Sequence, residues 1–197
     1  MYNSKCKDCK FHETYIYPGI VSKSQKGKAY HDEKLFFHDK YVPDYMGKIY
    51  DLMLIKLSEK LDFSADPVTH YRPMNSICLV QGNTFNPFNE YAIMTGFGTV
   101  SPTRGVDRLQ VGWTLIREIR FNDDDGDGWT IVVDQYRGNG SIPCSGDSGG
   151  PLFQYLNGRA VLIGIYRSVT GCETKETSYY VRVSRHIDWI VKTITNN

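Results

Sequence analysis

Short apolar runs separated by turn residues are the feature that most restricts the fold of this chain. Each run has the length of a strand rather than of a helix, and glycine, proline or asparagine stands in the gaps between them. The runs cover residues 35–37, 51–57, 77–80, 91–95, 109–116, 129–133, 161–166 and 179–183. Strands at such intervals, without helices between them, are typical of a barrel or a sandwich. The sequence therefore predicts an all-β fold.

The C-terminal segment is the one exception to this pattern. Ile187, Ile190, Val191 and Ile194 recur at helical spacing and mark one apolar face. Ser184 precedes them and has the side chain of a helix N-cap. We expect a C-terminal α-helix over residues 184–197.

Length and charge exclude several classes of function. A chain of 197 residues fits one domain with a real core, and its net charge of +1 favours neither nucleic acid nor electrostatic attachment to a membrane. No apolar run approaches the roughly 20 residues that span a bilayer, and the first thirty residues lack the apolar segment of a signal peptide. We expect neither nucleic acid nor membrane as a partner.

Neither the cysteines nor the acidic residues of this chain indicate a metal site. The five cysteines lack the spacing of a zinc site and favour disulfides in an oxidising compartment, which predicts an extracellular protein. Residues 123–128 match the start of a calcium-binding loop, but Asp134 stands where that loop needs glutamate. We interpret the run as a solvated acidic turn and predict no metal and no cofactor.

Residues 144–151, Cys-Ser-Gly-Asp-Ser-Gly-Gly-Pro, place one serine among glycines and small polar residues. Such a turn exposes the Oγ atom of Ser148 together with nearby backbone N–H groups, as acyl transfer requires of a nucleophile beside an oxyanion hole. The run resembles the nucleophile motif of the chymotrypsin/trypsin-like serine proteases.

Other segments resemble the same family in the same order. They are residues 51–57 (Asp-Leu-Met-Leu-Ile-Lys-Leu), 95–98 (Thr-Gly-Phe-Gly), 164–166 with 171–172, and 180–183 followed by 189–190. The likeness covers about residues 35–197 and implies a double β-barrel with a C-terminal helix. On this basis residues 1–85 are expected to be a remnant of the first barrel, which is incomplete, and residues 86–183 the second barrel.

The resemblance also implies roles for individual residues. Ser148 is the expected nucleophile and Asp51 the carboxylate that orients the base. Backbone N–H groups of Gly146 and Ser148 are the expected oxyanion donors. Asp147 corresponds to the carboxylate that pairs with a new N-terminal ammonium when members of the family are activated.

Pocket residues follow from the same likeness. Ile142 stands six residues before Ser148, where members that cleave after lysine or arginine carry aspartate, so cleavage after basic residues is disfavoured. Arg167, Ser168 and Val169 stand where the family has Ser-Trp-Gly along the substrate backbone.

The cysteines are assigned by the resemblance as well. Cys144 and Cys172 stand where the family joins the nucleophile loop to the pocket loop by a disulfide. Cys78 is predicted either to be unpaired or to form a disulfide with Cys6 or Cys9.

The general base is the main departure from the family pattern. Its motif, Thr-Ala-Ala-His-Cys, is absent from this chain. Of the five histidines His12 is a weak candidate; His31 and His38 are interpreted as solvated loop residues, and His70 and His186 as structural or surface groups. Lys5 occupies the register of the missing base.

Two hypotheses remain. The first is a serine endopeptidase acting on proteins or peptides, with protein inhibitors as further partners, of which this chain lacks the catalytic histidine. The second is a secreted, inactive protease homologue that binds other proteins through its loops. The residue that a full-length sequence carries at the position of the base distinguishes them.

Overall fold

The structure is a computed structural model that describes residues 14–41, 50–82, 85–101, 104–120, 129–134, 141–172 and 176–197. The chain divides into two compact units, Met1–Ser76 and Ile77–Asn197. Each unit is described by itself. None of the helices in the described ranges is long and apolar enough to cross a membrane.

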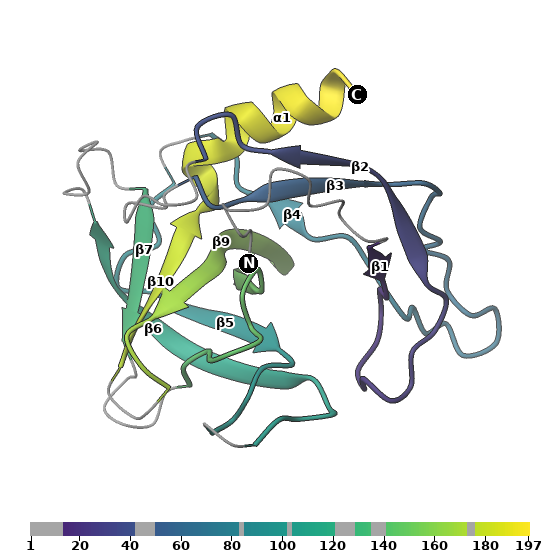
Figure 1. Ribbon diagram of the computed structural model, residues 1–197, viewed down its shortest axis with the longest axis horizontal. Coiled ribbons are helices and arrows are strands. Elements are labelled where there is room, and N and C mark those ends of the chain that lie inside the picture. The colour runs from purple at the N-terminus through teal and green to yellow at the C-terminus, as the bar shows by residue number, and fades with distance from the viewer. Residues whose placement is uncertain are drawn as a thin grey trace, which may run out of the picture. The chain divides into compact units, whose positions relative to one another are not determined.

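The first unit contains a three-stranded antiparallel sheet in the order β1-β2-β3 (Figure 1). Its strands are β1 (Tyr15–Ile16), β2 (Tyr30–Phe37) and β3 (Met53–Leu57). Ile16 pairs with Tyr30, and Leu35 pairs with Ile55. Tyr30 is the most deeply buried aromatic residue of this sheet, at 4% exposure. The sheet lies in the part of the chain for which an incomplete barrel is expected.

A closed barrel forms the second unit (Figure 1). Its strands are β5 (Tyr91–Gly96), β6 (Gln110–Arg120), β7 (Thr130–Asp134), β8 (Pro151–Leu156), β9 (Arg159–Val169) and β10 (Thr177–Arg182). Among the described residues the sheet runs β10-β7-β6-β5-β8-β9, and pairing of β10 with β9 closes it. A short strand, β4 (Cys78–Leu79), adds to β9 in parallel. The predicted all-β fold of trypsin-like type is confirmed.

The barrel core consists of inward-facing apolar side chains from consecutive strands. Ile116, Ile131, Leu152, Ile163 and Tyr180 are each at most 1% exposed. Alternation along each strand sends every second side chain to this interior. Closing the sheet removes the unpaired edges that an open sheet of this length would present. The barrel is therefore a firm support for the loops between its strands.

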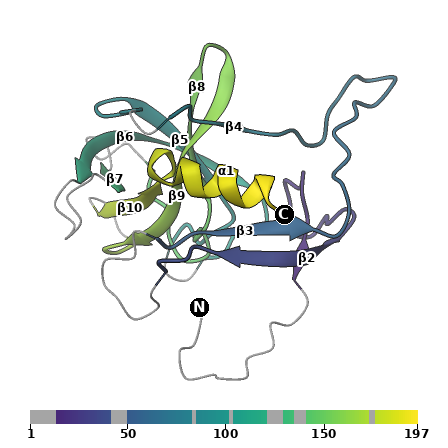
Figure 2. The same ribbon diagram turned by 90° about the horizontal axis from the view of Figure 1, so that it is seen from above.

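Strand β8 is absent from the sequence-based expectation. The Gly-Gly-Pro end of the nucleophile motif is typical of a turn, yet Pro151 is itself the first residue of β8. Proline is tolerated at the first position of a strand, because the missing N–H group costs no ladder bond there. The chain therefore passes from the nucleophile motif directly into the β8–β9 hairpin, which Figure 2 shows from above.

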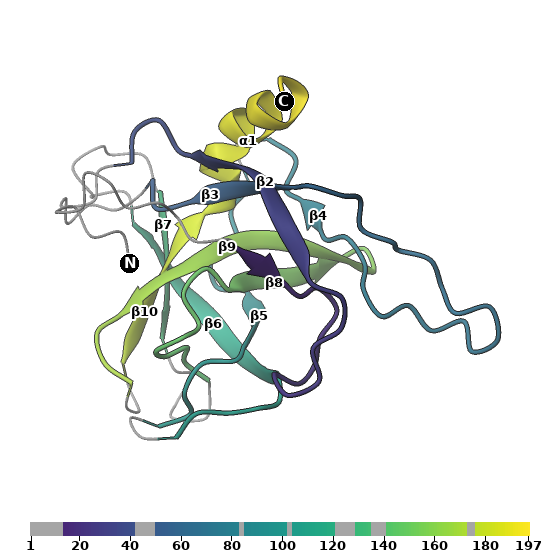
Figure 3. The same cartoon turned by 45° about the vertical axis from the view of Figure 1, so that its right-hand side comes forward.

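The C-terminal helix is shorter than expected. A 3₁₀ turn, η2 (Val183–His186), leads into α1 (Ile187–Thr195), and the chain enters both directly from β10 (Figure 3). Ser184 is not the N-cap: it lies inside η2, 1% exposed, and its Oγ atom has no hydrogen bond to a described residue. The 3₁₀ turn moves the start of the α-helix three residues along the chain.

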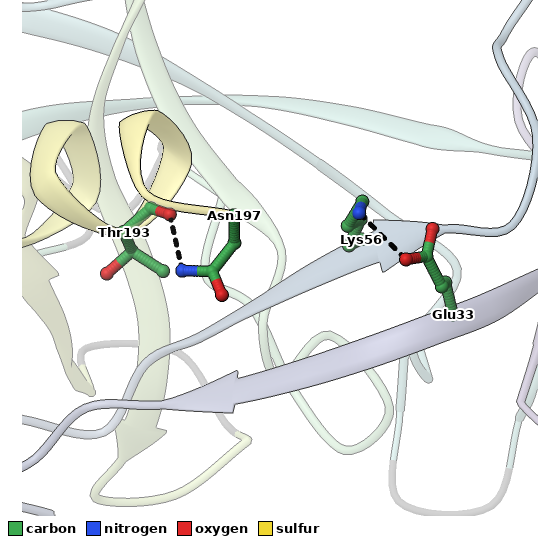
Figure 4. Close-up of polar contacts among 4 residues, drawn as sticks. All are labelled: Glu33, Lys56, Thr193 and Asn197. Atoms are coloured by element: carbon green, nitrogen blue, oxygen red, sulfur yellow. Dashed lines mark hydrogen bonds and ion pairs between the residues drawn. The ribbon is translucent and has the colours of Figure 1, made fainter.

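Two polar contacts stabilise exposed parts of the two units (Figure 4). In the sheet of the first unit Lys56 and Glu33 form an ion pair of 2.7 Å. At the end of the second unit the side-chain amide of Asn197 donates 3.1 Å to the carbonyl oxygen of Thr193. Both contacts are exposed, so each contributes little to stability.

Candidate active site

The nucleophile motif folds into two consecutive turns between the buried Cys144 and the start of β8. Ser148 lies at the start of the second turn and is exposed. The N–H of Asp147 donates 3.1 Å to the carbonyl of Cys144, and the N–H of Gly150 donates 2.8 Å to the carbonyl of Asp147. These bonds close the loop on itself and hold Ser148 at its tip.

Two glycines give the loop its shape. Gly146 has φ +94° and Gly149 has φ +82°, a region that side chains other than hydrogen make unfavourable. The glycines of this motif predict a turn, and the structure requires glycine at these two positions.

Two backbone N–H groups of the loop are available to a ligand. Neither Gly146 nor Ser148 donates its N–H to any described residue, and the Oγ atom of Ser148 makes no hydrogen bond with one either. Free donors beside an exposed hydroxyl suit an oxyanion that forms when this hydroxyl attacks a carbonyl carbon.

Asp147 turns its side chain away from the exposed face of the loop. Its Oδ1 atom accepts 2.7 Å from the N–H of Gly98, and its Oδ2 atom accepts 2.9 Å from the N–H of Cys144. Charge-assisted bonds of this kind are stronger than neutral ones. The carboxylate therefore links the loop to residues that follow β5.

A disulfide joins Cys144 to Cys172, with 5.3 Å between the Cα atoms. It is the pairing that the family resemblance implies. The Oγ1 atom of Thr99 also donates to the sulfur of Cys144, at 3.2 Å. The start of the nucleophile loop is thus held to the segment after β9 as well as to that after β5.

A cavity of about 300 Å³ lies behind the loop. Ile142, Asp147, Tyr166 and both cysteines of the disulfide contribute to its lining, whereas Ser148, Arg167, Ser168 and Val169 do not. The structure therefore brings Ile142 and Asp147 to one cavity and leaves the other expected pocket residues outside it.

Strand β9 carries the remaining expected pocket residues, all of them half-buried. The Arg167 guanidinium lies 5.9 Å from the ring centroid of Tyr179. Ser168 pairs with Tyr179, and Val169 pairs with Ser178 on β10. The register of this pairing shifts between Tyr179 and Tyr180, which leaves Arg167 as the extra residue of a β-bulge and interrupts the regular alternation of side chains there. Their role toward a substrate stays a prediction.

Tyr166 is a site residue that the sequence analysis named only as part of a motif. Burial raises the pKa of its phenol to about 12, and the charge of Asp147 acts in the same direction. Its ring centroid lies 5.5 Å from that of Tyr180, which burial also makes harder to ionise, with a raised pKa. The signal that could have found it is a large aromatic residue inside an otherwise aliphatic strand.

Asp51 belongs to the first unit, where it precedes β3. The apolar residues after it predict a buried carboxylate, whereas the structure leaves it half-buried. The reason lies in the sheet: β3 is an edge strand of three, and Met53 and Ile55 are themselves 40% and 39% exposed. Its role as the triad acid stays a prediction.

His31 and His38 differ from expectation. His12 lies outside the described residues. His31 is an exposed residue of β2 rather than of a loop, with its ring 4.8 Å from that of Tyr15. His186 is 1% exposed and packs 4.9 Å from Trp129, in keeping with a structural group.

His38 is half-buried rather than solvated. Its ring stacks on Tyr50 at 4.7 Å, and its backbone N–H donates 3.4 Å to the carbonyl of Leu52. Burial lowers the pKa of the imidazole, opposed by the charge of Asp39 and assisted by that of Lys40. His38 thus lies beside the segment that carries Asp51.

Comparison with known proteins agrees with these features. Residues 12–190 match the sequence profile of the family described as Trypsin. The chain is also similar to U21-ctenitoxin-Pn1a of Phoneutria nigriventer, with 32% identity over 195 residues, which is 91% of this chain and 77% of that protein.

Proposed function

Because this chain belongs to the trypsin family, we propose that it is a serine-type endopeptidase with Ser148 as its nucleophile. The observation that carries the proposal is the exposed hydroxyl of Ser148 on a turn whose two N–H groups, those of Gly146 and Ser148, meet no described acceptor. Family membership supports a hydrolase; the roles of individual residues are our proposal.

The chemical step is acyl transfer. The Oγ atom of Ser148 attacks the carbonyl carbon of the scissile peptide bond and gives up its proton to a base. The carbonyl oxygen gains the negative charge, which the N–H groups of Gly146 and Ser148 stabilise by hydrogen bonds. As the intermediate collapses, the C–N bond breaks and the protonated base passes its proton to the departing nitrogen, which leaves as the amine. The acyl-serine that remains is then hydrolysed by water, which restores the serine hydroxyl.

The general base of the family is a histidine, and its motif is absent from this chain. Asp51 would orient a histidine, but no histidine follows the Thr-Ala-Ala-His-Cys pattern. We propose that the 197-residue chain lacks this residue and hydrolyses peptides slowly. Loss of one triad member typically leaves about 10³–10⁴-fold catalysis over water, from the oxyanion donors and substrate binding alone.

Substrate preference follows from Ile142. It stands where the family members that cleave after lysine or arginine carry aspartate, and it contributes no charge to the cavity that it lines. The Asp147 carboxylate, which lines the same cavity, already accepts hydrogen bonds from the N–H groups of Gly98 and Cys144, so a cationic side chain buried there would lose its hydration without a carboxylate of its own. We propose that the primary substrate residue is apolar.

The test is hydrolysis of activated esters, which need less help from a base than peptides do. The wild-type chain is compared with Ser148→Ala on a matched pair of substrates, one with a large apolar side chain and one with a basic side chain. We expect slow turnover that favours the apolar ester and is absent from Ser148→Ala. Turnover that survives the substitution would refute the proposed nucleophile.

A second candidate function is that of a catalytically inactive homologue that binds proteins. It is favoured by Arg167, Ser168 and Val169, which replace the Ser-Trp-Gly of the family along the substrate backbone. A folded protein whose ester hydrolysis equals that of Ser148→Ala would favour this candidate. In either case we propose an extracellular protein, because disulfides such as that of Cys144 and Cys172 persist in oxidising compartments.

A further inference from the structure

Two glycines surround the carboxylate of Asp147. A Cβ atom on Gly96 would lie 2.8 Å from Cγ of Asp147, and a Cβ atom on Gly98 would lie 2.6 Å from Oδ1 of the same residue. Real Cβ atoms essentially never approach another heavy atom within 3.0 Å. The space that the carboxylate occupies therefore exists only because both positions lack a side chain.

Backbone conformation does not explain these glycines. Neither Gly96 nor Gly98 has the positive φ that Gly146 and Gly149 have, so φ does not exclude alanine at either position. The conflict arises from the Cβ atom that alanine would add. Glycine at positions 96 and 98 is thus required by Asp147 and not by a turn.

The same residues set the position of the nucleophile loop. Asp147 stands between Gly146 and Ser148, whose N–H groups are the proposed oxyanion donors. The carboxylate is held by the N–H of Gly98, and the N–H of Thr99 donates 2.9 Å to the carbonyl of Ser145. Segment 96–99 therefore holds the nucleophile loop by two hydrogen bonds, one to Asp147 and one to Ser145.

We infer that Gly96 and Gly98 are positioning residues, whose missing side chains form a seat for the Asp147 carboxylate and thereby hold the 144–150 loop with its N–H groups outward. The seat rests on geometry alone. Its importance for a nucleophile rests on the proposed function of Ser148.

The experiment is a double-mutant cycle on the purified chain. Gly98→Ala is measured alone and together with Asp147→Ala, because removal of the carboxylate also removes the conflict. Gly98→Ala alone should lower the melting temperature by roughly 4–10 °C, as expected when a methyl group is forced into a filled space. In the Asp147→Ala background, Gly98→Ala should lower the melting temperature by less than about 2 °C.

Two other glycines provide matched controls. A Cβ atom on Gly105 would meet nothing within 4 Å, so Gly105→Ala should leave the melting temperature unchanged or slightly raised. A Cβ atom on Gly112 would instead conflict with Ser141, so Gly112→Ala should be destabilising in both backgrounds. Only positions 96 and 98 should be coupled to Asp147.

Local amide hydrogen exchange separates positioning from general stability. Gly98→Ala should raise exchange at least tenfold in the peptide that covers residues 144–150, with little change in β7 and β10, and Gly112→Ala should not single out this peptide. The seat is refuted if Gly98→Ala lowers the melting temperature as much in the Asp147→Ala background as in the wild type. It is also refuted if Gly98→Ala leaves hydrogen exchange of the loop unaltered. Melting temperature and hydrogen exchange can both be measured without catalysis. If the proposed function fails but the seat is correct, Ser148 will be unreactive while the loop still responds to these substitutions as predicted.

Discussion

The backbone N–H of Gly149 donates a hydrogen bond of 2.9 Å to the carbonyl of Tyr166, and the N–H of Tyr166 returns one of 2.8 Å to the carbonyl of Gly150. This reciprocal pair ties the two residues after Ser148 to β9. Together with Asp147 and the disulfide, it anchors the nucleophile loop to three separate segments of the barrel. The site is therefore held by the fold rather than by contacts within the loop alone.

Tyr166→Phe should change how stability depends on alkaline pH. The phenol ionises near pH 10 in the unfolded chain, and burial raises its pKa to about 12 in the folded protein. A raised pKa contributes stability that is present below pH 10 and lost as pH rises through 12. Tyr166→Phe cannot ionise, so its free energy of unfolding should fall less between pH 10 and 12.

Urea denaturation at several pH values measures this difference. Between pH 7 and 9 the gap between Tyr166→Phe and the wild type should stay constant, which serves as the internal control. Parallel curves up to pH 12 would show that Tyr166 ionises as easily in the folded chain as in the unfolded one.

Removal of the disulfide should destabilise the second unit strongly. Cys144 and Cys172 are 28 residues apart, so the bridge restricts a sizeable loop of the unfolded chain. The double variant Cys144→Ala/Cys172→Ala should lose about 2–4 kcal/mol of unfolding free energy. Chemical denaturation measures the loss, with Cys78→Ala, a half-buried free cysteine, as the control that removes a thiol without removing a bridge. Equal losses in both proteins would speak against the bridge as the source.

His38 should make the first unit sensitive to mild acid. Burial against Tyr50 lowers its pKa, so the neutral form is favoured in the folded state. A lowered pKa contributes stability that is present above the unfolded value of 6.5 and lost as pH falls through the folded value. His38→Gln should therefore flatten the decline in stability below pH 6.5. The near neighbours Asp39 and Lys40 remain in both proteins, and an unchanged decline would assign the effect to other groups.

Gly146→Ala should disable the proposed oxyanion site. Its φ of +94° is unfavourable for alanine, at a cost of about 1–3 kcal/mol if the loop keeps its shape. If the loop relaxes instead, the Gly146 N–H turns away and ester hydrolysis should fall by about 10²–10³-fold. The hydrolysis rate, corrected for the folded fraction by circular dichroism, measures this. Full activity in a folded Gly146→Ala protein would exclude this N–H as a donor.

The sequence was most informative where one residue type determines the outcome. Strand-length apolar runs predicted eight of the ten strands in the described residues, because the length and composition of such a run indicate a buried strand locally. Strand β8 was not predicted, because its first residue is proline and the two glycines immediately before it are typical of a turn. The helix start was misplaced because a 3₁₀ turn and an α-helix begin with similar residues.

The candidate site, too, could be predicted from the sequence only in part. Motifs in the sequence predicted roles for Ser148 and Asp147, which stay predictions, and the Cys144–Cys172 disulfide, which the structure contains. They could not predict the link between Tyr166 and the loop, or the seat that Gly96 and Gly98 form, because these depend on how strands pack. Packing between distant segments leaves no local pattern to read.

The most direct measurement is reaction of the purified chain with a fluorophosphonate, followed by intact mass and peptide mapping. We predict a single adduct that forms slowly at Ser148 and is absent from Ser148→Ala, accompanied by little hydrolysis of peptides. Rapid labelling with efficient peptide hydrolysis would contradict the missing base. A folded protein that forms no adduct at Ser148 would contradict the nucleophile itself.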